Sequence, residues 1–600
     1  MSGAEREIVR RFDLLRQAQE AGLSRREMHR LGLLAGGGVA LAGRGPRRAA
    51  AQTVGLTALN DPILKPVSPR TRPWVEAMPV PPVLGETPLT PDGGRHQYYS
   101  RFPAQRTYQL TAREAQHSFH PDLPASTIWG YNGIFPGPTI DARYGQPLLL
   151  RIANALPSLA THKGFGIPQT VTHLHNFHTA SESDGGPWDW TDPGGHKDHH
   201  YTMARAGFSV PDTIPAEFRD ASGGDVRETL TTLFLHEHRP EFTAANVYKG
   251  LVTMVRLFDE KDTGDETNAA GWQLPSGPYD VPLAFADKLF NPTTGQLTFD
   301  SFNTDGHLGD KVSVNGKIQP VFTVKRRKYR FRVLNGSQAR FYSLALRSGG
   351  VNKPFTQLTE SGNFLEAPVP NLTKLEVWPA ERFDIIVDFS KFAAGAEVIL
   401  ANTMAMADGR GPNRDKPQSP DDVRFQLVKF KVSSEAVTDP STIPLKFRPF
   451  PAVNLAEVAQ RRTFALGRSN GSWTINGEFW DPDIDHTAAS LASPRNLVRR
   501  NTAEIWTLTN SSGGWEHPLH IHFEEAQLLK VNGIAPKRRI RTDIYRLGQG
   551  STIEMFMRFR DFPDPDFVPA TPGTGGRYAM HCHNTTHEDH SMMATWNIAP

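Results

Sequence analysis

The chain has 600 residues, of which 38% are hydrophobic and 22% are charged. This length is enough for several domains, each with an apolar core. Its 66 basic and 63 acidic residues leave a net charge of only +3, so we predict neither a nucleic-acid partner nor a membrane anchor. A single cysteine excludes any intrachain disulfide.

Residues 1–51 have the features of an export signal. Ser24-Arg25-Arg26-Glu27-Met28 comes before an apolar, glycine-rich run from Leu31 to Ala42, and Ala49-Ala50-Ala51 offers a small-residue cleavage site. The apolar run is too short for a transmembrane span. The segment resembles a twin-arginine signal, which predicts a periplasmic or secreted protein. The alternative is a short helix with an incidental arginine pair.

Residues 52–104 are rich in proline and polar residues, and we predict an extended strap there. The cluster Met78-Pro79-Val80-Pro81-Pro82 cannot join the interior of a sheet, because proline lacks the N–H that a ladder needs. Short strand-like runs follow, such as Thr107–Thr111 and Pro147–Ile152, with glycine and proline at the turns between them. We assign residues 105–260 to a first domain.

Two His-x-His motifs lie in this first domain: His173-Leu174-His175 and His236-Glu237-His238. Alternate side chains of a strand share a face, so each motif presents two imidazoles to the same side. Such a pair suits a shared metal cluster. The alternative for either motif alone is a pair of ordinary strand histidines.

Residues 181–201 are predicted to be a long irregular stretch between the two motifs. The stretch contains His196, His199 and His200, for which we favour solvated loop histidines over a further metal site.

Residues 261–435 contain one histidine, His307, and no cysteine, so they cannot supply a metal site of the same kind. The run Tyr329–Asn335 nevertheless has the alternation of a strand, and we expect its Arg330 and Arg332 to face water. We therefore predict a second domain without metal that separates and holds the outer two.

A charged loop rich in proline and glycine, Met406–Arg424, is expected to be mobile, and residues 436–600 form the third predicted domain. Strand-like runs end in Asn132-Gly133, Asn315-Gly316 and Asn476-Gly477, one in each domain. This repetition favours three related β units, although Asn-Gly alone is only a turn signal. Many short strands with glycine and proline turns predict an all-β fold of Greek-key β-sandwiches.

The third domain holds the densest set of candidate ligands. His517-Pro518-Leu519-His520-Ile521-His522 is followed by His581-Cys582-His583, and then by His587 and Met592. If His581-Cys582-His583 continues a strand, the thiol faces one way and both imidazoles the other. Two histidines, a thiolate and a weak axial methionine are the ligands of a blue-copper electron-transfer centre. A lone cysteine is more often a buried small hydrophobe, so the prediction depends on all four histidine-rich stretches together.

These four motifs resemble those of the multicopper oxidases, in particular the three-domain group of laccases, bilirubin oxidases and spore-coat laccases. The resemblance covers roughly residues 75–600. It implies three cupredoxin-like domains and four coppers, one of type 1, one of type 2 and two of type 3. The type 2 copper would be bound by His173 and His520. The type 1 copper would be bound by His517, Cys582, His587 and Met592. The type 3 pair would be bound by His175, His236, His238, His522, His581 and His583.

The resemblance also implies two carboxylates that handle protons, Asp184 in Ser183-Asp184-Gly185 and Glu588 beside His587. Their plain alternatives are an Asp-Gly turn and a surface carboxylate. The second motif departs from the family, because Glu237 replaces its central aspartate. That change leaves open which hydrogen bonds support the imidazoles of this motif.

By this resemblance the chain is an enzyme that takes single electrons from a small-molecule reductant at the type 1 copper. Cys582 connects through the backbone to His581 and His583, and the three remaining coppers reduce dioxygen to water. We expect phenols and aromatic amines, including bilirubin-like pigments, as reductants. Oxidation of Cu(I) or Mn(II) in metal tolerance ranks second, because the 12 methionines form only small pairs such as Met404 and Met406. A copper-binding protein without turnover ranks third, because it would not need the complete ligand set.

Overall fold

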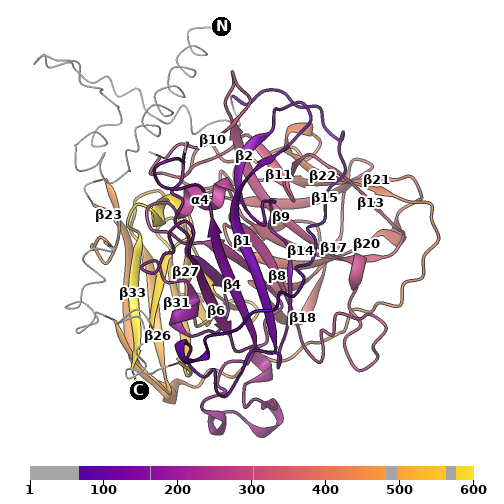
Figure 1. Cartoon of the computed structure of the whole chain (residues 1–600). Helices are drawn as coiled ribbons and strands as arrows, with labels where there is room; N and C mark the ends of the chain where they lie inside the picture. The colour runs from indigo at the N-terminus through magenta and orange to yellow at the C-terminus, as the bar shows by residue number, and fades with distance from the viewer. Residues whose placement is uncertain are drawn as a thin grey trace, which may run out of the picture.

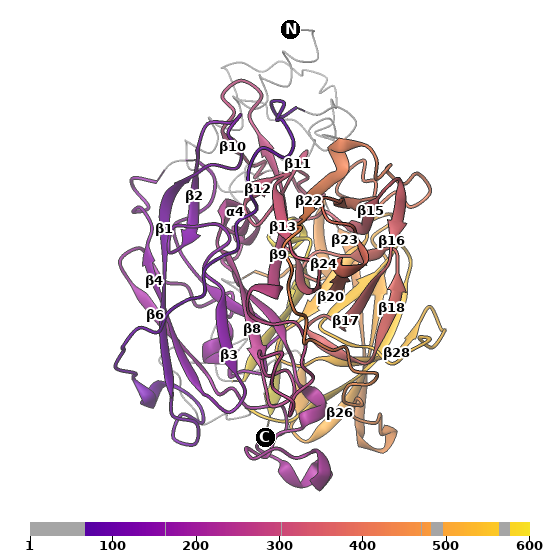
Figure 2. The same cartoon turned by 90° about the vertical axis from the view of Figure 1, so that its right-hand side faces the viewer.

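The computed structural model describes residues 67–162, 164–301, 303–469, 471–481, 496–562 and 576–599. The predicted export signal, residues 1–51, lies outside the described residues. The regular secondary structure of the described chain is mostly strand, and the strands form six sheets. Figures 1 and 2 show the strands grouped by their position in the chain: indigo to purple, pink to orange, and orange to yellow. The prediction of an all-β fold is confirmed.

The first pair of sheets contains the described strands from β1 to β8. One sheet has the order β2-β1-β4-β6, with β1 (Arg106–His117), β2 (Ser126–Tyr131), β4 (Leu148–Ala155) and β6 (His196–Tyr201). The other has the order β3-β8-β7-β5, with β3 (Ile140–Arg143), β5 (Thr172–His175), β7 (Thr232–Glu237) and β8 (Val252–Phe258). Leu110 and Ile152 of one sheet share a core with Leu174 and Leu235 of the other.

The second pair of sheets lies between residues 280 and 432. The larger sheet has the order β12-β11-β9-β14-β20-β17-β18, and β10 pairs with β9. Its strands are β9 (Asp280–Phe290), β10 (Leu297–Thr298), β11 (Lys311–Val314), β12 (Lys317–Ile318), β14 (Lys328–Asn335), β17 (Phe355–Glu360), β18 (Asn363–Leu372) and β20 (Arg382–Asp388). The smaller sheet has the order β13-β22-β21-β15-β16, and β19 pairs with β15. Its strands are β13 (Val321–Val324), β15 (Tyr342–Ser348), β16 (Val351–Lys353), β19 (Leu375–Val377), β21 (Glu397–Asn402) and β22 (Gln426–Val432).

The third pair of sheets contains the described strands from β23 onward. One sheet has the order β24-β23-β26-β31-β28-β29, with β23 (Val458–Ser469), β24 (Ser472–Ile475), β26 (Thr502–Asn510), β28 (Ala526–Val531), β29 (Arg541–Thr542) and β31 (Thr552–Phe559). The other has the order β25-β33-β32-β27-β30, with β25 (Leu497–Arg499), β27 (His517–Ile521), β30 (Ile544–Leu547), β32 (Arg577–Cys582) and β33 (Met593–Ala599). The described strands fall within the three predicted domain ranges, whose boundaries at 105, 261 and 436 stay predictions.

The described part of the strap connects the second pair of sheets to the first. Met78 N–H donates to the carbonyl of Val321 at 2.7 Å, and Leu84 N–H donates to the carbonyl of Thr139 at 2.8 Å. Met78 also enters the core of the second pair. The proline-rich segment therefore makes single bonds to sheet edges rather than a full ladder, as its missing donors require.

Arg330 and Arg332 do not face water, so this prediction is wrong. Both side chains are fully buried. Arg330 pairs with Asp384 at 2.5 Å, and Arg332 pairs with Asp280 at 2.7 Å and donates to the carbonyl of Thr231 at 2.9 Å. The face of β14 that would be solvated in an isolated domain is covered here by residues at the start of β7.

The loop Met406–Arg424 is tied to the third domain beside a predicted ligand. Glu516 N–H donates to the carbonyl of Arg410 at 2.7 Å, and Arg414 donates to both carboxylate oxygens of Glu516 at 2.6 and 2.9 Å. Glu516 immediately precedes His517. A loop that composition marks as mobile is thus fixed by backbone and ion-pair contacts next to the third-domain site.

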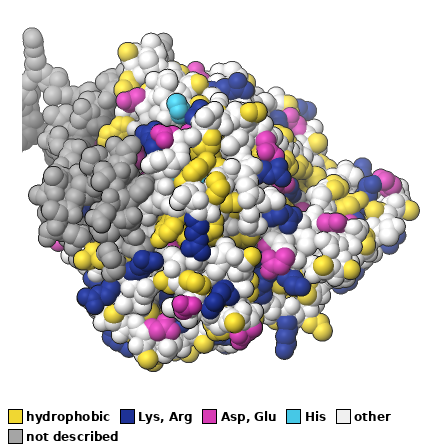
Figure 3. Space-filling view, turned by 60° about the horizontal axis from the view of Figure 1, so that its bottom comes forward, with side chains coloured by type: hydrophobic (Ala, Val, Ile, Leu, Met, Phe, Trp, Pro, Cys, Tyr) yellow, Lys and Arg dark blue, Asp and Glu magenta, His cyan; other side chains and the backbone are white. Residues whose placement is uncertain are grey.

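On the face shown in Figure 3, basic and acidic side chains are interspersed rather than gathered into one patch of a single sign. In the described residues, no helix has the length and apolar character needed to cross a membrane.

Candidate metal centre

Four predicted ligands of the first domain project from the paired strands β5 and β7. The two strands are antiparallel, and His173 lies directly opposite His236. His175 follows two positions later on β5, and His238 follows just beyond the end of β7. Alternation along each strand therefore places the members of each His-x-His motif on the same side.

The third domain supplies its ligands from β27 and β32, which are also antiparallel. His520 lies opposite His581, and Leu519 lies opposite Cys582. Because neighbouring residues of a strand point to opposite faces, Cys582 joins the apolar core with Leu519 while His581 points away from it. The thiol and its flanking imidazoles therefore serve different sites.

The two domains meet so that eight histidines form one buried cluster. His173 Nε2 lies 3.4 Å from His520 Nε2, and His175 Nδ1 lies 3.3 Å from His236 Nε2. His581 Nε2 lies 3.1 Å from both His238 Nε2 and His522 Nε2. His583 completes the cluster, with its ring 5.0 Å from that of His175.

Hydrogen bonds from the ring nitrogens that point out of the cluster show which nitrogen of a ring carries the proton. Nitrogens that point into the cluster then face each other without a proton between them. His173 Nδ1 donates to the carbonyl of Asp184 at 2.5 Å, and His520 Nδ1 donates to the carbonyl of Asp543 at 3.1 Å. Each of these neutral imidazoles therefore has an unprotonated Nε2. Two lone pairs 3.4 Å apart repel each other unless a cation lies between them. The cluster thus fits a bound metal, and imidazole suits copper.

Burial favours the neutral form of most of these histidines, which is the form that binds a metal. Burial is the main cause that lowers the pKa of His173, His175, His520, His522 and His583 well below the ordinary value. Neither ring nitrogen of His583 has a hydrogen-bond partner among the described residues. An unpaired buried polar group is costly, so this ring also indicates a ligand absent from the polypeptide.

A second, smaller site surrounds the thiol. Cys582 Sγ lies 3.4 Å from His517 Nδ1 and 3.6 Å from His587 Nδ1. The outer nitrogens have other partners: His517 Nε2 contacts Ser512 Oγ at 2.8 Å, and His587 Nε2 donates to the carbonyl of Asp305 at 3.0 Å. His517, Cys582 and His587 are all fully buried.

Met592 lies beside this thiolate site at the other end of a tight turn. Its carbonyl accepts from Cys582 N–H at 3.1 Å, and its N–H donates to the carbonyl of His587 at 3.0 Å. The turn contains the short helix α7 (Thr585–Glu588). The side chain of Met592 is fully buried in the third-domain core. The site therefore brings together the two imidazoles and the thiol of a blue-copper centre, and the backbone places Met592 next to them.

Both predicted proton-handling carboxylates lie against the histidine cluster. Asp184, at the end of the short helix α3 (Ser181–Asp184), accepts from His522 Nδ1 at 2.7 Å through Oδ2. Glu588 Oε2 lies 3.1 Å from His581 Nδ1. Burial opposes ionisation of Glu588, but His581 and His238 bring the pKa of this carboxyl below its ordinary value. Neither carboxylate is exposed, so the surface alternative for Glu588 is wrong.

Glu237, the departure within the second motif, points away from the cluster. Its carboxylate accepts from the N–H groups of Val171 and Arg239 and from Asn246 Nδ2. Asn246 belongs to the helix α4 (Thr243–Lys249). His236 Nδ1 instead donates to the backbone carbonyl of Glu237 at 2.8 Å. The substitution therefore leaves that ligand's support to the backbone.

The structure corrects the prediction for residues 181–201. His196, His199 and His200 lie on the strand β6, and only His196 is exposed. His199 Nδ1 donates to the carbonyl of Ser183 at 2.9 Å, and His200 Nε2 donates to the carbonyl of Phe102 at 2.8 Å. These two histidines hold backbone in place and belong to none of the potential ligand groups found among the described residues.

Sequence reasoning missed Asp543, a buried aspartate that touches the cluster. Asp543 Oδ2 lies 2.6 Å from His175 Nε2. The residue follows Arg541-Thr542 and has no histidine or cysteine nearby in sequence, so no spacing pattern marks it.

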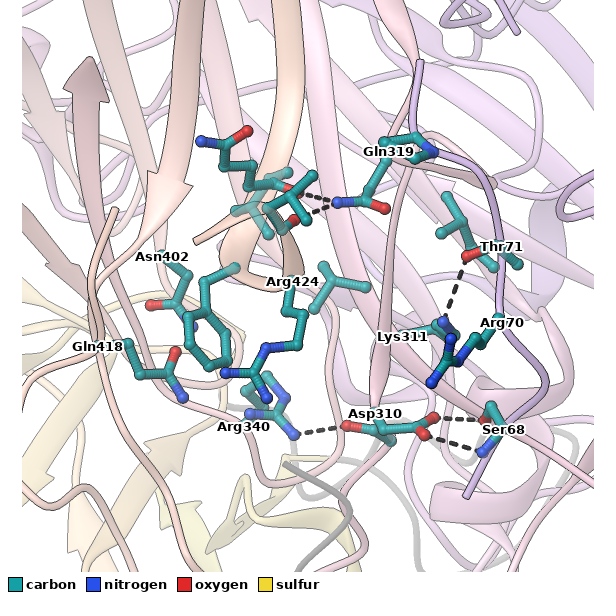
Figure 4. Close-up of a pocket in the computed structure, with 18 residues that line it drawn as sticks. Ser68, Arg70, Thr71, Asp310, Lys311, Gln319, Arg340, Asn402, Gln418 and Arg424 are labelled. Atoms are coloured by element: carbon teal, nitrogen blue, oxygen red, sulfur yellow. Dashed lines mark hydrogen bonds between the residues drawn. The ribbon is translucent and has the colours of Figure 1, made fainter. Parts of the chain in front are cut away.

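A pocket of about 630 Å³ lies away from the metal centre, between the strap and the second domain (Figure 4). Four cationic side chains and one carboxylate line it: Arg70, Lys311, Arg340, Arg424 and Asp310. No predicted copper ligand borders it.

Comparison with known proteins agrees with this geometry. Residues 112–209 and 468–600 match family profiles described as multicopper oxidase. The chain is 30% identical over 573 residues to a laccase of Haloferax volcanii, which covers 88% of this chain and 85% of that protein. This chain belongs to the multicopper oxidase family.

Other multicopper oxidases are similar over the same extent. A bilirubin oxidase of Albifimbria verrucaria is 28% identical over 551 residues, which covers 88% of this chain and 82% of that protein. Among solved structures, a laccase of Pediococcus acidilactici aligns with a TM-score of 0.66 at 24% identity, over 88% of this chain and 95% of that one. The predicted family and the cupredoxin-like fold are confirmed, and the chain is an enzyme of this family.

Proposed function

We propose that the chain is a laccase-like oxidase, which takes single electrons from phenols or aromatic amines at a type 1 copper and reduces dioxygen to water at a trinuclear copper cluster. The observation that carries the proposal is Cys582 itself. Its thiol lies in one buried donor set, and its neighbours His581 and His583 lie in the other. A single tripeptide thus joins both sites through the backbone.

Four coppers fit the donor sets. His517, Cys582, His587 and Met592 would hold the type 1 copper, and His173 and His520 would hold the type 2 copper. The type 3 pair would use the remaining six histidines: His175, His236, His238, His522, His581 and His583. When bound, these coppers supply one-electron redox chemistry at the thiolate and the electrons that dioxygen needs at the cluster.

The protein's own groups supply position and protons. Burial raises the pKa of Asp184 well above its ordinary value, and its Oδ1 has no hydrogen-bond partner. Asp184 Oδ1 is therefore an atom at which a proton can be held beside the cluster. Glu588 lies next to His581, and its lowered pKa favours the ionised carboxylate, which can accept a proton.

An organic reductant is favoured by the surroundings of the type 1 donor set. The Trp473 ring lies 4.1 Å from that of His587, and the partly buried Trp515 lies 5.2 Å from Trp473. Both type 1 histidines are fully buried, so these indoles provide an aromatic connection toward the surface.

The methionines and two carboxylates near the type 1 donor set offer little to a metal ion as reductant. All ten described methionines, including Met404 and Met406, are buried in cores. Two nearby carboxylates are paired: Asp305 lies 3.1 Å from Arg468, and Glu516 lies 2.6 Å from Arg414. This observation disfavours the alternative of Cu(I) or Mn(II) oxidation.

Oxygen uptake by copper-loaded protein tests the proposal, with a phenol, bilirubin, Cu(I) and Mn(II) offered separately. Uptake with the organic reductants and little with either metal is expected. A preference for a metal ion would replace the proposal with a role in metal homeostasis. No uptake by protein that holds copper would leave a copper-binding protein without turnover.

We also propose that residues 1–51 export the protein by the twin-arginine route to the periplasm or the medium. The Arg25-Arg26 pair before an apolar run supports this. Replacing both with lysine should leave the protein inside the cell, as measured by fractionation and immunoblotting. Unchanged export of that variant would contradict the proposal.

A further inference from the structure

The predicted metal-free domain reaches the histidine cluster through one buried ion pair. Arg382 on β20 donates to both carboxylate oxygens of Asp543, each at 3.1 Å. Arg382 belongs to the second predicted domain and Asp543 to the third. Neither side chain is exposed.

Asp543 in turn touches two predicted ligands that come from different domains. Its Oδ2 lies 2.6 Å from His175 Nε2, and its backbone carbonyl accepts from His520 Nδ1 at 3.1 Å. The two imidazoles are stacked, with ring centroids 3.7 Å apart. One residue therefore contacts the outer nitrogens of a predicted type 3 ligand and a predicted type 2 ligand.

The position of the protons follows from these contacts. An imidazole nitrogen and a carboxylate oxygen only 2.6 Å apart would repel each other unless a proton lay between them. We place this proton on His175 Nε2, because the other ring nitrogen, Nδ1, faces the cluster, where a metal needs its lone pair. His175 Nδ1 is then bare, and it is the nitrogen that faces His236 at 3.3 Å. The contact between His175 Nε2 and Asp543 is short, but it does not have the geometry of a regular hydrogen bond, so its angle is bent.

Asp543 could alternatively be a metal ligand itself, since its carboxylate, His175 and His520 lie close enough to share an ion. The guanidinium of Arg382 disfavours this. It is a fixed positive charge that already engages both oxygens, and a second cation at the same carboxylate would be repelled. The carboxylate therefore acts on the imidazoles rather than on the metal.

We propose that Asp543, held by Arg382 from the metal-free domain, is a positioning residue that sets the tautomer and orientation of His175 and the orientation of His520. The inference rests on the proposed copper sites of the cluster. It assigns to the second domain a contribution to copper binding beyond that of a spacer. Groups that hydrogen-bond to a metal-ligating histidine fix the orientation of its ring, and their loss weakens metal binding about 10- to 100-fold.

The test compares Asp543→Asn with a matched control, Glu381→Gln. Glu381 is also a buried carboxylate of this interface, and it accepts two bonds of 2.6 Å from Arg546 of the third domain. Among the described residues, the Glu381 carboxylate contacts Arg546 and the N–H of Trp378, and neither is a predicted copper ligand. Its loss therefore weakens the same interface without reaching the cluster. Arg382→Lys is the second variant, since lysine keeps the positive charge but lacks the planar guanidinium that donates to both oxygens of the carboxylate.

Each variant is loaded with copper, dialysed against a graded chelator, and measured by copper analysis, the type 2 electron paramagnetic resonance signal and thermal unfolding. We expect Asp543→Asn to lose cluster copper at roughly 10- to 100-fold lower chelator concentration, with an altered type 2 signal and unchanged blue colour. Arg382→Lys should show a smaller change in the same direction. Glu381→Gln should lower the unfolding temperature and leave the copper and its signal unchanged.

Wild-type copper retention and an unaltered type 2 signal in Asp543→Asn would overturn the inference. Equal copper loss in Asp543→Asn and Glu381→Gln would also overturn it, because the pair would then be only structural. A wild-type cluster that takes up no copper would overturn the proposed function itself, which separates that failure from the first two.

Discussion

The two donor sets of this protein are built in opposite ways. The thiolate site takes all its predicted ligands from residues 517–592 of one domain, on β27, β32 and the turn after it. The histidine cluster takes four histidines from the first domain and four from the third, and His173 faces His520 across 347 positions of sequence. The first site needs one domain to fold, whereas the second needs two domains to dock.

The assembly of the cluster therefore depends on contacts at the domain interface. Glu228 of the first domain meets Arg541 and Arg560 of the third at 3.2 and 2.5 Å, and all three are buried. Arg541 also donates to Asn363 Oδ1 of the second domain at 2.8 Å. Changes at this junction should affect the cluster first, while changes inside the third domain should affect the thiolate site alone.

Cys582→Ser should give the largest effect, the complete loss of both blue colour and oxidase activity. Serine offers no thiolate, but none of the eight cluster histidines is altered. We therefore expect one copper fewer per chain by metal analysis and a retained type 2 signal. A blue, active variant would contradict the assignment of Cys582.

Asp184→Asn should slow dioxygen reduction about 10²- to 10⁴-fold, because a positioned acid contributes that much to proton transfer. Reduction of the thiolate site by substrate without oxygen should keep its rate, since the Asp184 carboxylate lies against His173 and His522 of the cluster. The two rates can be read from oxygen uptake and from anaerobic bleaching of the blue band. Asp198→Asn, which removes a carboxylate paired with Arg151, is the control and should change neither rate. Equal slowing of both rates would contradict the prediction.

Glu228→Gln should lower the free energy of unfolding by about 3–5 kcal/mol, because it leaves two buried guanidinium groups short of a partner. We expect the cluster to release copper at a lower denaturant concentration than the one at which the blue colour fades. Simultaneous loss of both would show that the two sites do not differ in their need for docking.

The same variant has a defined effect on pH dependence. Burial opposes ionisation of Glu228, but Arg560 and Arg541 bring its pKa below the ordinary value of 4.5. A carboxyl whose folded pKa is depressed stabilises the fold above its unfolded pKa, and this stability is lost as the pH falls through the folded pKa. The fall in wild-type stability below about pH 4.5 should therefore be shallower in Glu228→Gln, as measured by denaturant unfolding across that range.

Met592→Leu should have the smallest effect, a rise in the reduction potential of the thiolate site with the blue colour retained. The axial ligand tunes this potential, and a thioether stabilises oxidised copper more than an alkyl group does. Redox titration of the blue band measures the change. Copper retention by the cluster should be unaffected, and a lower potential would contradict the assignment of Met592.

The sequence predicted well what depends on local geometry. The His-x-His motifs share a side, and Cys582 points opposite to His581, because strand alternation is fixed within a few residues. It did not predict what depends on docking. Arg330 and Arg332 alternate like a solvated face, yet the first domain covers them. Asp543 carries no motif, because its importance comes from Arg382 and His175, which lie 161 and 368 positions away.

The division of the cluster between distant domains also sets an order in time. Domains fold largely as units during synthesis, beginning with the N-terminal one. A folded first domain would carry His173, His175, His236 and His238 as an open half-site while the rest of the chain is still being made. The other four histidines lie on or just after β27 and β32 of the third domain, which are made later. The cluster can therefore be completed only after the third domain has been made.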